Sequence, residues 1–148
     1  MPRVIGAFFI EINFMAGYSG TPLVKKLGLT EGLVIFLGDA PETYFDSISP
    51  LPKGLVVKDK LVGEFDFIHL FVNQVRRFQK EFISGKKHLK KTGMLWISWP
   101  KKSSKVPTDL DENIIRDFGL SEGLVDVKVC AVDETWSGLK FVYRTKDR

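Results

Sequence analysis

Residues 38–42 carry polar side chains directly after an apolar run, at a point where a small molecule could bind. The carboxylates of Asp39 and Glu42 can accept hydrogen bonds from hydroxyl or ammonium groups. A dinucleotide-binding turn has several glycines, so that backbone amides can approach phosphate, whereas here Gly38 is followed by Ala40. The turn therefore predicts a small polar ligand in place of a dinucleotide. In the alternative interpretation, the two carboxylates only cap a short helical turn.

Further polar and aromatic residues follow later apolar segments of the chain. Acidic groups on one side of a crevice and lysines on the other would hold a polar or anionic small molecule against an aromatic wall. Together with residues 38–42, the predicted ligand-binding set contains Asn73, Trp99, Lys101, Lys102 and Trp136. The same surface is a candidate for a protein partner. The alternative is structural, with solvated lysines in a surface loop and a tryptophan that covers the closing hairpin turn.

The sequence predicts no catalytic residue. His69 lies in an apolar stretch, which favours a packed, hydrogen-bonded core histidine over a general base. Cys130 is the single cysteine, and in its apolar context it resembles a small core hydrophobe. One cysteine excludes an internal disulfide, and two histidines with one cysteine argue against a structural zinc site. A reduced, cytoplasmic setting is the simplest expectation.

The predicted site depends on parallel strands that end at one edge of a sheet. Leu33–Leu37 is apolar without alternation, which is typical of a strand covered on both faces by helices. Phe65–Val72 and Met94–Trp99 have the same character, and Leu55–Lys58 predicts a shorter strand at or near an edge. In such sheets ligands bind in the crevice beyond the carboxyl ends of the strands, where the polar residues named above stand.

Predicted helices alternate with these strands, at Pro22–Leu27, Thr43–Ile48, Gln74–Lys91 and Asp109–Glu122. Asn73 and Thr108 are the predicted caps of the last two helices. The last strands, Val127–Val132 and Leu139–Tyr143, have so short a connection that they must form an antiparallel hairpin. This order predicts one three-layer, Rossmann-like α/β domain, with a mostly parallel sheet of about six strands that ends in the hairpin.

The predicted helix 74–91 is strongly basic and makes nucleic-acid binding one alternative function. A basic stripe attracts nucleic acid through counterion release. No base-stacking aromatic residue is interleaved on the polar face, because Phe78 and Phe82 should be buried. A net charge of +4 permits an anionic partner without requiring one. We therefore favour a solvated face for the cations of this helix, which are Arg76, Arg77, Lys80, Lys86, Lys87, Lys90 and Lys91.

Several segments resemble the class I S-adenosylmethionine-dependent methyltransferase fold, namely GLVIFLGD, FDFIHLFV, MLWISW and the final hairpin. The resemblance implies a methyltransferase-like α/β domain over residues 15–148, with an active methyltransferase as a further alternative function. Three segments are similar to a bacterial family of small proteins of unknown function, namely MAGYSGTPLVKKLGL, LWISWPKKSSKVPTDL and GLVDVKVCAVDETWSGLKFV. That second likeness extends from Met15 to Arg144.

The turn after the first strand departs from the methyltransferase pattern. Phe36 stands where the family has an acidic residue, and Ala40 replaces the second glycine of its Gly-x-Gly turn. Pro41 also removes an amide donor. Asp59 matches the position of the family's ribose-binding acid, but too few residues separate it from Phe65 for the family's third strand and following helix. We therefore predict a closed, altered site without a cofactor, and S-adenosylmethionine is the alternative ligand.

The start of the chain needs a separate interpretation. Val4–Ile10 is apolar but stops at Glu11, well short of the ~20 residues that cross a bilayer, and no cleavage site follows. Met15 then opens a segment that reads as a natural beginning. We expect residues 1–14 to be an N-terminal extension peripheral to the domain, and we expect no membrane association.

Overall fold

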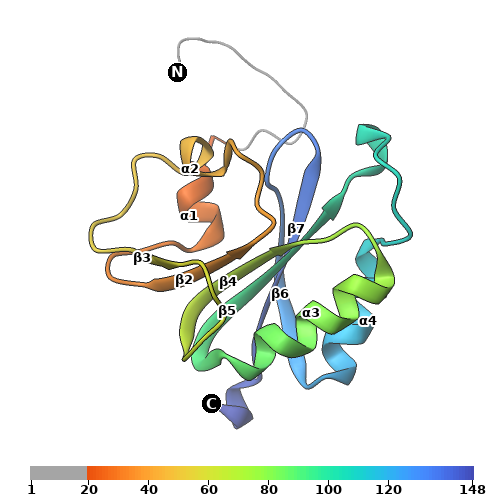
Figure 1. Cartoon of the computed structure of the whole chain (residues 1–148). Helices are drawn as coiled ribbons and strands as arrows, with labels where there is room; N and C mark the ends of the chain where they lie inside the picture. The colour runs from red at the N-terminus through yellow and green to blue at the C-terminus, as the bar shows by residue number, and fades with distance from the viewer. Residues whose placement is uncertain (1–19) are drawn as a thin grey trace.

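The computed structural model describes residues 20–148, so the expected extension at residues 1–14 lies outside the described residues. A six-stranded sheet runs in the order β3-β2-β4-β5-β7-β6, with helices on both of its faces (Figure 1). This arrangement confirms the predicted three-layer α/β fold. Strand β7 alone runs against its neighbours β5 and β6, which confirms a mostly parallel sheet with a closing antiparallel hairpin.

The strands form where the sequence has its apolar runs. Continuous apolar segments become the central strands because both faces of those strands are covered. Their bounds are β2 Val34–Gly38, β3 Val56–Lys58, β4 Phe65–Phe71, β5 Leu89–Pro100, β6 Leu124–Ala131 and β7 Trp136–Tyr143. The three residues of β3 are all exposed, and β3 is an edge strand as predicted.

Side chains of β4 alternate between two cores, one on each face of the sheet. Ile68 and Leu70 face helices α3 and α4, whereas Phe67 and Phe71 face helices α1 and α2. Each of the four α-helices within residues 20–148 therefore packs on a defined side of the central strands. The helix bounds are α1 Leu23–Leu27, α2 Tyr44–Ser47, α3 Val75–Lys87 and α4 Glu112–Ser121, with short 3-10 turns at Lys102–Ser104 and Thr145–Asp147.

Helix α3 ends earlier than the sequence pattern predicts. Residues 89–91 belong to strand β5 and not to the helix. The backbone amide of Phe65 donates to the carbonyl of His88 at 2.8 Å, and Leu89 pairs with Phe65 in the sheet. Leu89 is buried in either arrangement, so its apolar character could not distinguish a last helical turn from the start of a strand.

Both predicted helix caps are wrong, because the capping residues come from the loop that precedes α4. The carboxylate of Asp111 accepts a hydrogen bond from the amide of Ile114 at 2.8 Å and caps α4. The carboxylate of Asp109 accepts from the amide of Val75 at 2.7 Å, at the start of α3. Thr108 instead donates from Oγ1 to the backbone carbonyl of Asn73 at 2.7 Å. The loop before α4 therefore also fixes the start of α3.

The connection from β3 to β4 is unusually short for the path that it follows. Strands β3 and β4 lie on opposite sides of β2 and both run parallel to it, so residues 59–64 must return across β2. Such crossovers usually contain a helix and a dozen or more residues. Here Leu61 packs on the same core as α3 and α4, which places the loop on that face of the sheet. A single short loop thus replaces a covering helix.

Candidate functional site

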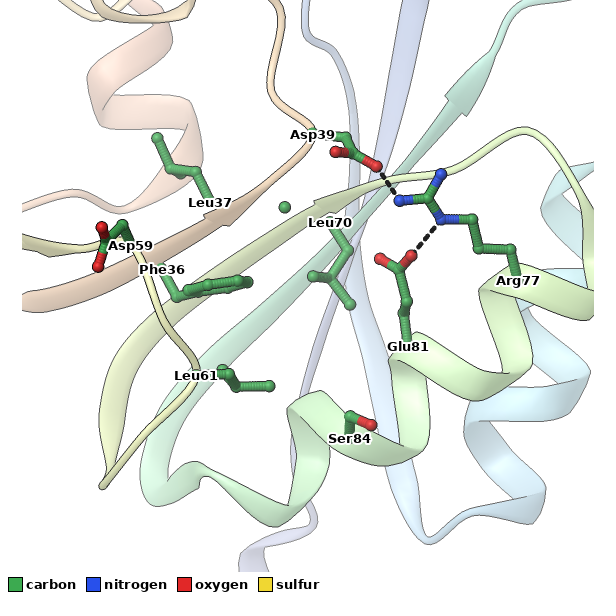
Figure 2. A pocket seen from close by; sticks show the side chains of 10 residues that line it. Phe36, Leu37, Asp39, Asp59, Leu61, Leu70, Arg77, Glu81 and Ser84 are labelled. Atoms are coloured by element: carbon green, nitrogen blue, oxygen red, sulfur yellow. Dashed lines mark hydrogen bonds and ion pairs between the residues drawn. The ribbon is translucent and has the colours of Figure 1, made fainter.

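A cleft of about 370 Å³ lies between strand β2, the loop 59–64 and helix α3 (Figure 2). It begins at the carboxyl end of β2 and extends along the face of the sheet beside α3. Its position follows from the short crossover, because no helix of residues 20–148 covers β2 next to α3. The lining residues are Phe36, Leu37, Gly38, Asp39, Asp59, Leu61, Leu70, Arg77, Glu81 and Ser84. The prediction that this crevice is closed is therefore wrong.

The floor of the cleft is apolar. Phe36 and Leu70, from the neighbouring strands β2 and β4, point toward the cavity together with Leu61 from the loop (Figure 2). The Phe36 ring also packs edge-on against Phe65, with ring centroids 5.9 Å apart. A flat aromatic or heterocyclic group can pack against such a floor.

Gly38 leaves room for the Leu70 side chain where β2 meets the cleft. A Cβ atom at this position would lie 2.8 Å from Cδ2 of Leu70, which is closer than real Cβ contacts allow. Asp39 follows with a φ of 55°, in the left-handed region that non-glycine residues rarely adopt. The close approach of Leu70 and the sharp turn at Asp39 together direct the chain, and the Asp39 carboxylate, over the mouth of the cleft (Figure 2).

An ion-pair network crosses the mouth of the cleft. The guanidinium of Arg77, on α3, donates to the carboxylates of both Asp39 and Glu81 (Figure 2). The side chains of Arg77 and Asp39 are 53% and 55% exposed, so this pair contributes at most about 1 kcal/mol to folding. The Glu81 and Asp39 carboxylates raise the pKa of Arg77. The network can therefore rearrange around a ligand at small cost.

The charges around the cleft favour a ligand with hydroxyl or cationic groups. Asp39, Asp59 and Glu81 supply three carboxylates against the one cation of Arg77. Asp59 follows directly on β3, at the carboxyl end of the strand, as the resemblance implies for an acid that binds ribose hydroxyls. Ionised carboxylates accept hydrogen bonds only, so hydroxyl, amino and ammonium groups are their natural partners.

The structure brings two of the predicted site residues, Gly38 and Asp39, into this cleft. Ala40 packs against the core on the α1 and α2 side, and Glu42 is exposed outside the cleft lining. Asn73 is also exposed and outside the lining. None of these three residues lines the cleft to which Gly38 and Asp39 belong.

The predicted aromatic wall is divided between the two faces of the sheet. Trp99 is only 7% exposed and belongs to the core under α3 and α4. Trp136 packs on the other core, with its ring 5.1 Å from that of Phe71. Lys101 and Lys102 follow β5, where the amide of Lys101 donates to the carbonyl of Thr135. Ligand binding by these residues stays a prediction, since they lie outside the cleft beside β2.

Sequence reasoning missed the contribution of α3 to the site. Arg77, Glu81 and Ser84 recur at helical spacing and therefore lie on one face of α3. From the sequence alone, Arg77 belongs to the predicted solvated face of the basic helix, and Glu81 is not among the predicted site residues. The mixed signs at positions 77 and 81 were the available signal, because an i, i+4 pair next to an uncovered strand can line a cleft.

His69 is a core residue, which confirms its prediction. Its Nδ1 lies 2.8 Å from Oη of Tyr44, and its Nε2 lies 2.7 Å from Oγ of Ser98, so the neutral ring donates one hydrogen bond and accepts the other. Burial lowers the pKa of His69 to about 3. Burial, and to a lesser extent the nearby Cys130, raises the pKa of Tyr44. This network is fully enclosed and belongs to folding rather than to the cleft.

Solved structures with this fold include several methyltransferases. A precorrin-6y C5,15-methyltransferase from Geobacter metallireducens has a TM-score of 0.56 at 9% identity, with 82% of this chain and 86% of that chain covered. A magnesium protoporphyrin IX methyltransferase from Synechocystis, solved with bound SAH, has a TM-score of 0.53 at 13% identity, with coverages of 82% and 78%. An S-adenosylmethionine-dependent methyltransferase from Clostridium acetobutylicum has a TM-score of 0.53 at 10% identity, with coverages of 79% and 85%.

These likenesses show a methyltransferase-like α/β fold. At identities of 9–13% they show the fold alone. No family model matches the sequence, and no curated protein matches it either. A function can therefore be argued only from the residues that line the cleft.

Two further features of residues 20–148 bear on the class of site. No group of three or more His, Cys, Asp or Glu side chains in this part of the chain is placed to hold a metal ion. Within the same residues, no helix has the length and apolar character needed to span a bilayer.

Proposed function

We propose that the cleft beside β2 binds the adenosyl part of S-adenosylmethionine and that the protein is a methyltransferase that uses this cofactor. One observation carries the proposal: Gly38 and Asp39 from the end of β2 and Asp59 from the end of β3 line one cleft with an aromatic floor. Its volume of about 370 Å³ lies within the range of small-molecule sites, about 300–1,000 Å³. The fold that this chain shares with methyltransferases supports the choice of S-adenosylmethionine as the ligand.

The residues present fit the chemistry of this cofactor. Asp59 would accept hydrogen bonds from ribose hydroxyls, and Phe36 with Leu61 would pack against the adenine ring. The carboxylates at the mouth would favour the positive charges of the ligand, and Arg77 would pair with its carboxylate. When bound, the cofactor supplies an electrophilic methyl group. The protein residues bind and orient it, which is a substantial part of catalysis for a transfer between two bound molecules.

The proposal replaces the expectation of an altered turn without a cofactor. That expectation depended on Ala40 and Pro41, which lie outside the cleft lining. It also depended on the shortened crossover, which was expected to remove the adenine site. In the structure the shortened crossover leaves a hollow above Phe36 instead.

Calorimetric titration with S-adenosylmethionine tests the proposal. We expect saturable binding to the wild-type chain, weakened about tenfold or more by Asp59→Asn, since a hydrogen bond to a charged group contributes about 1.5–3 kcal/mol. Asp46→Asn is the matched control, because it makes the same chemical change on the exposed surface of α2. No heat of binding, or equal affinities for the two variants, would contradict the proposal. That result would favour a small polar ligand of another kind or a protein partner at the strand ends.

A further inference from the structure

A second hollow adjoins the cleft on the outer side of helix α3. It has a volume of about 450 Å³ and is lined by Gln74, Arg76, Arg77, Lys80, Glu81 and Ser84. Three of these residues, Arg77, Glu81 and Ser84, also line the cleft beside β2. The two hollows are therefore neighbours along the helix. We refer to the second hollow as the α3 groove.

Some basic side chains of α3 and of the residues just after it already contact other groups of the protein, whereas others are free to bind a ligand. Lys86 donates to the carbonyl of Glu122, Lys90 pairs with Asp66 at 3.1 Å, and the ammonium of Lys91 lies 4.2 Å from the ring centroid of Tyr143. Within residues 20–148, by contrast, Arg76 and Lys80 form no ion pair, and both are exposed. Of the exposed α3 cations without an ion pair in this part of the chain, Arg76 and Lys80 line the groove, whereas Lys87 lies outside it.

The two hollows have opposite charge. Three carboxylates and one guanidinium line the cleft, whereas Arg76, Arg77 and Lys80 line the groove with Glu81 as the one carboxylate among its lining residues. A cationic or hydroxyl-bearing molecule suits the first hollow, and an anionic one suits the second. A ligand that fills both hollows needs both kinds of group, and two ligands side by side need one each.

We propose that the α3 groove binds the phosphate or carboxylate group of a small anionic methyl acceptor, with Arg76 and Lys80 as its charge partners. This assignment rests on the proposed function, which places the methyl donor in the adjoining cleft. Arg77 stands at the boundary of the two hollows and contacts both. The substrate class is therefore a small acid or phosphate ester that lies next to the donor.

The groove fits a small anion better than a nucleic acid. None of its lining residues is aromatic, so bases have nothing to stack on. Glu81 interrupts its positive charge, and further along the same segment Lys86, Lys90 and Lys91 are already engaged. A continuous positive track for a backbone of phosphates is therefore missing from this part of the chain.

Inorganic pyrophosphate is a suitable probe, because it supplies the proposed group without a recognition element for the cleft. We expect pyrophosphate to shift backbone amide resonances of residues 74–84 in the intact protein. The double variant Arg76→Gln/Lys80→Gln should weaken this binding about tenfold or more. Lys87→Gln is the matched control on the same helix outside the groove and should bind as the wild type does. The shifts should persist with S-adenosylhomocysteine present at saturation, because donor and acceptor bind together.

Several outcomes would overturn the inference. Equal binding by the double variant, or shifts centred on residues 101–105, would place the anion elsewhere. Competition between pyrophosphate and S-adenosylhomocysteine would mean that one ligand fills both hollows. If a short single-stranded RNA bound more tightly than pyrophosphate and with a steep salt dependence, the ligand of the groove would be a nucleic acid and not a small acceptor. Failure of the proposed function is separate: in that case the cofactor does not bind, or binds Asp59→Asn as well as wild type, while the response to pyrophosphate is unchanged.

Discussion

The face of the sheet that carries α3 and α4 has two halves with different coverings. Over β4, β5 and β7 the two helices close the surface, and aromatic rings meet edge-on between them, with Phe82 at 5.5 Å from Phe118 and 5.3 Å from Phe141. Over β2 and β3, within the described part of the chain, only the loop 59–64 crosses, and the cleft opens beneath it. We call these the closed half and the open half.

The difference separates folding from ligand binding in space. The closed half buries large side chains completely and supplies most of the apolar stabilisation of this face of the sheet. The open half keeps the side chain of Phe36 partly exposed beside carboxylates. This exposure lowers the stability of the fold but leaves space for a ligand. Substitutions in the two halves should therefore have different consequences.

The largest expected difference comes from removing one aromatic ring from each half. Phe82→Ala leaves a cavity in the closed half and should lower the free energy of unfolding by about 3–5 kcal/mol. Phe36→Ala should cost less than about 2 kcal/mol, because the ring is only partly buried, yet it should weaken binding of S-adenosylmethionine. Urea unfolding and calorimetry measure the two effects. Equal loss of stability in both variants would mean that the two halves do not differ as described.

Glycines on the two helices sharpen the comparison within the closed half. A Cβ atom at Gly119, on α4, would lie 2.1 Å from Cε1 of the buried Phe141, so Gly119→Ala should destabilise the protein by about 1–3 kcal/mol. At Gly85, on α3, the nearest atom would lie 3.5 Å away, at Leu95. Gly85→Ala should therefore stabilise by up to about 1 kcal/mol through helix propensity. A Gly119→Ala variant that is as stable as the wild type in urea unfolding would argue against the close packing of α4 on β7.

A buried polar group on the opposite face behaves differently from the solvated carboxylates of the cleft. The pKa of His69 is lowered to about 3 in the folded protein, from about 6.5 in an unfolded chain. Between these values the unfolded state binds the extra proton, so stability is complete above pH 6.5 and falls as the pH decreases. The loss from pH 6.5 to pH 5 should be about 1.5 kcal/mol.

Urea unfolding at the two pH values provides the measurement. His69→Gln should lose most of this pH dependence, whereas His88→Gln, which changes the second of the two histidines, should retain it. A pH-independent wild type would show that His69 is not desolvated as the structure describes.

The smallest effect on folding is expected at the mouth of the open half. Arg77→Gln breaks the pairs with Asp39 and Glu81 and should change stability by at most about 1 kcal/mol, because the guanidinium and the Asp39 carboxylate are both more than half exposed. The same change should weaken S-adenosylhomocysteine, which has a carboxylate, while 5′-methylthioadenosine, which lacks one, should bind unchanged. An equal effect on both ligands would mean that Arg77 does not contact the amino-acid part of S-adenosylhomocysteine.

The sheet was predictable because its strands are continuous apolar runs of strand length. Val34–Gly38 and Phe65–Phe71 have no helical periodicity, and the short link before Trp136 could only close a hairpin. The end of α3 and the cap at Asp109 were not predictable, since each is decided by a partner distant in sequence. Local patterns contain no information about such partners.

The site was predictable only where it coincides with a strand end. Gly38 ends strand β2 and Asp39 follows it, so both were found, and Asp59 was found through the methyltransferase resemblance. Trp99 and Trp136 also stand at strand ends, but strand alternation directs them into opposite cores. The hollow itself arises from the absence of a covering helix over β2, which is a property of three-dimensional packing that no single residue signals.

Mapping of backbone amide shifts during titration with S-adenosylhomocysteine tests the central claim most directly, because it reports where the ligand lies as well as whether it binds. The account predicts the largest shifts at Gly38, Asp39, Asp59 and Leu61, with few changes in the closed half around Phe118 and Phe141. Shifts confined to residues 101–105 and 133–136, or a spectrum that does not change at saturating ligand, would contradict it.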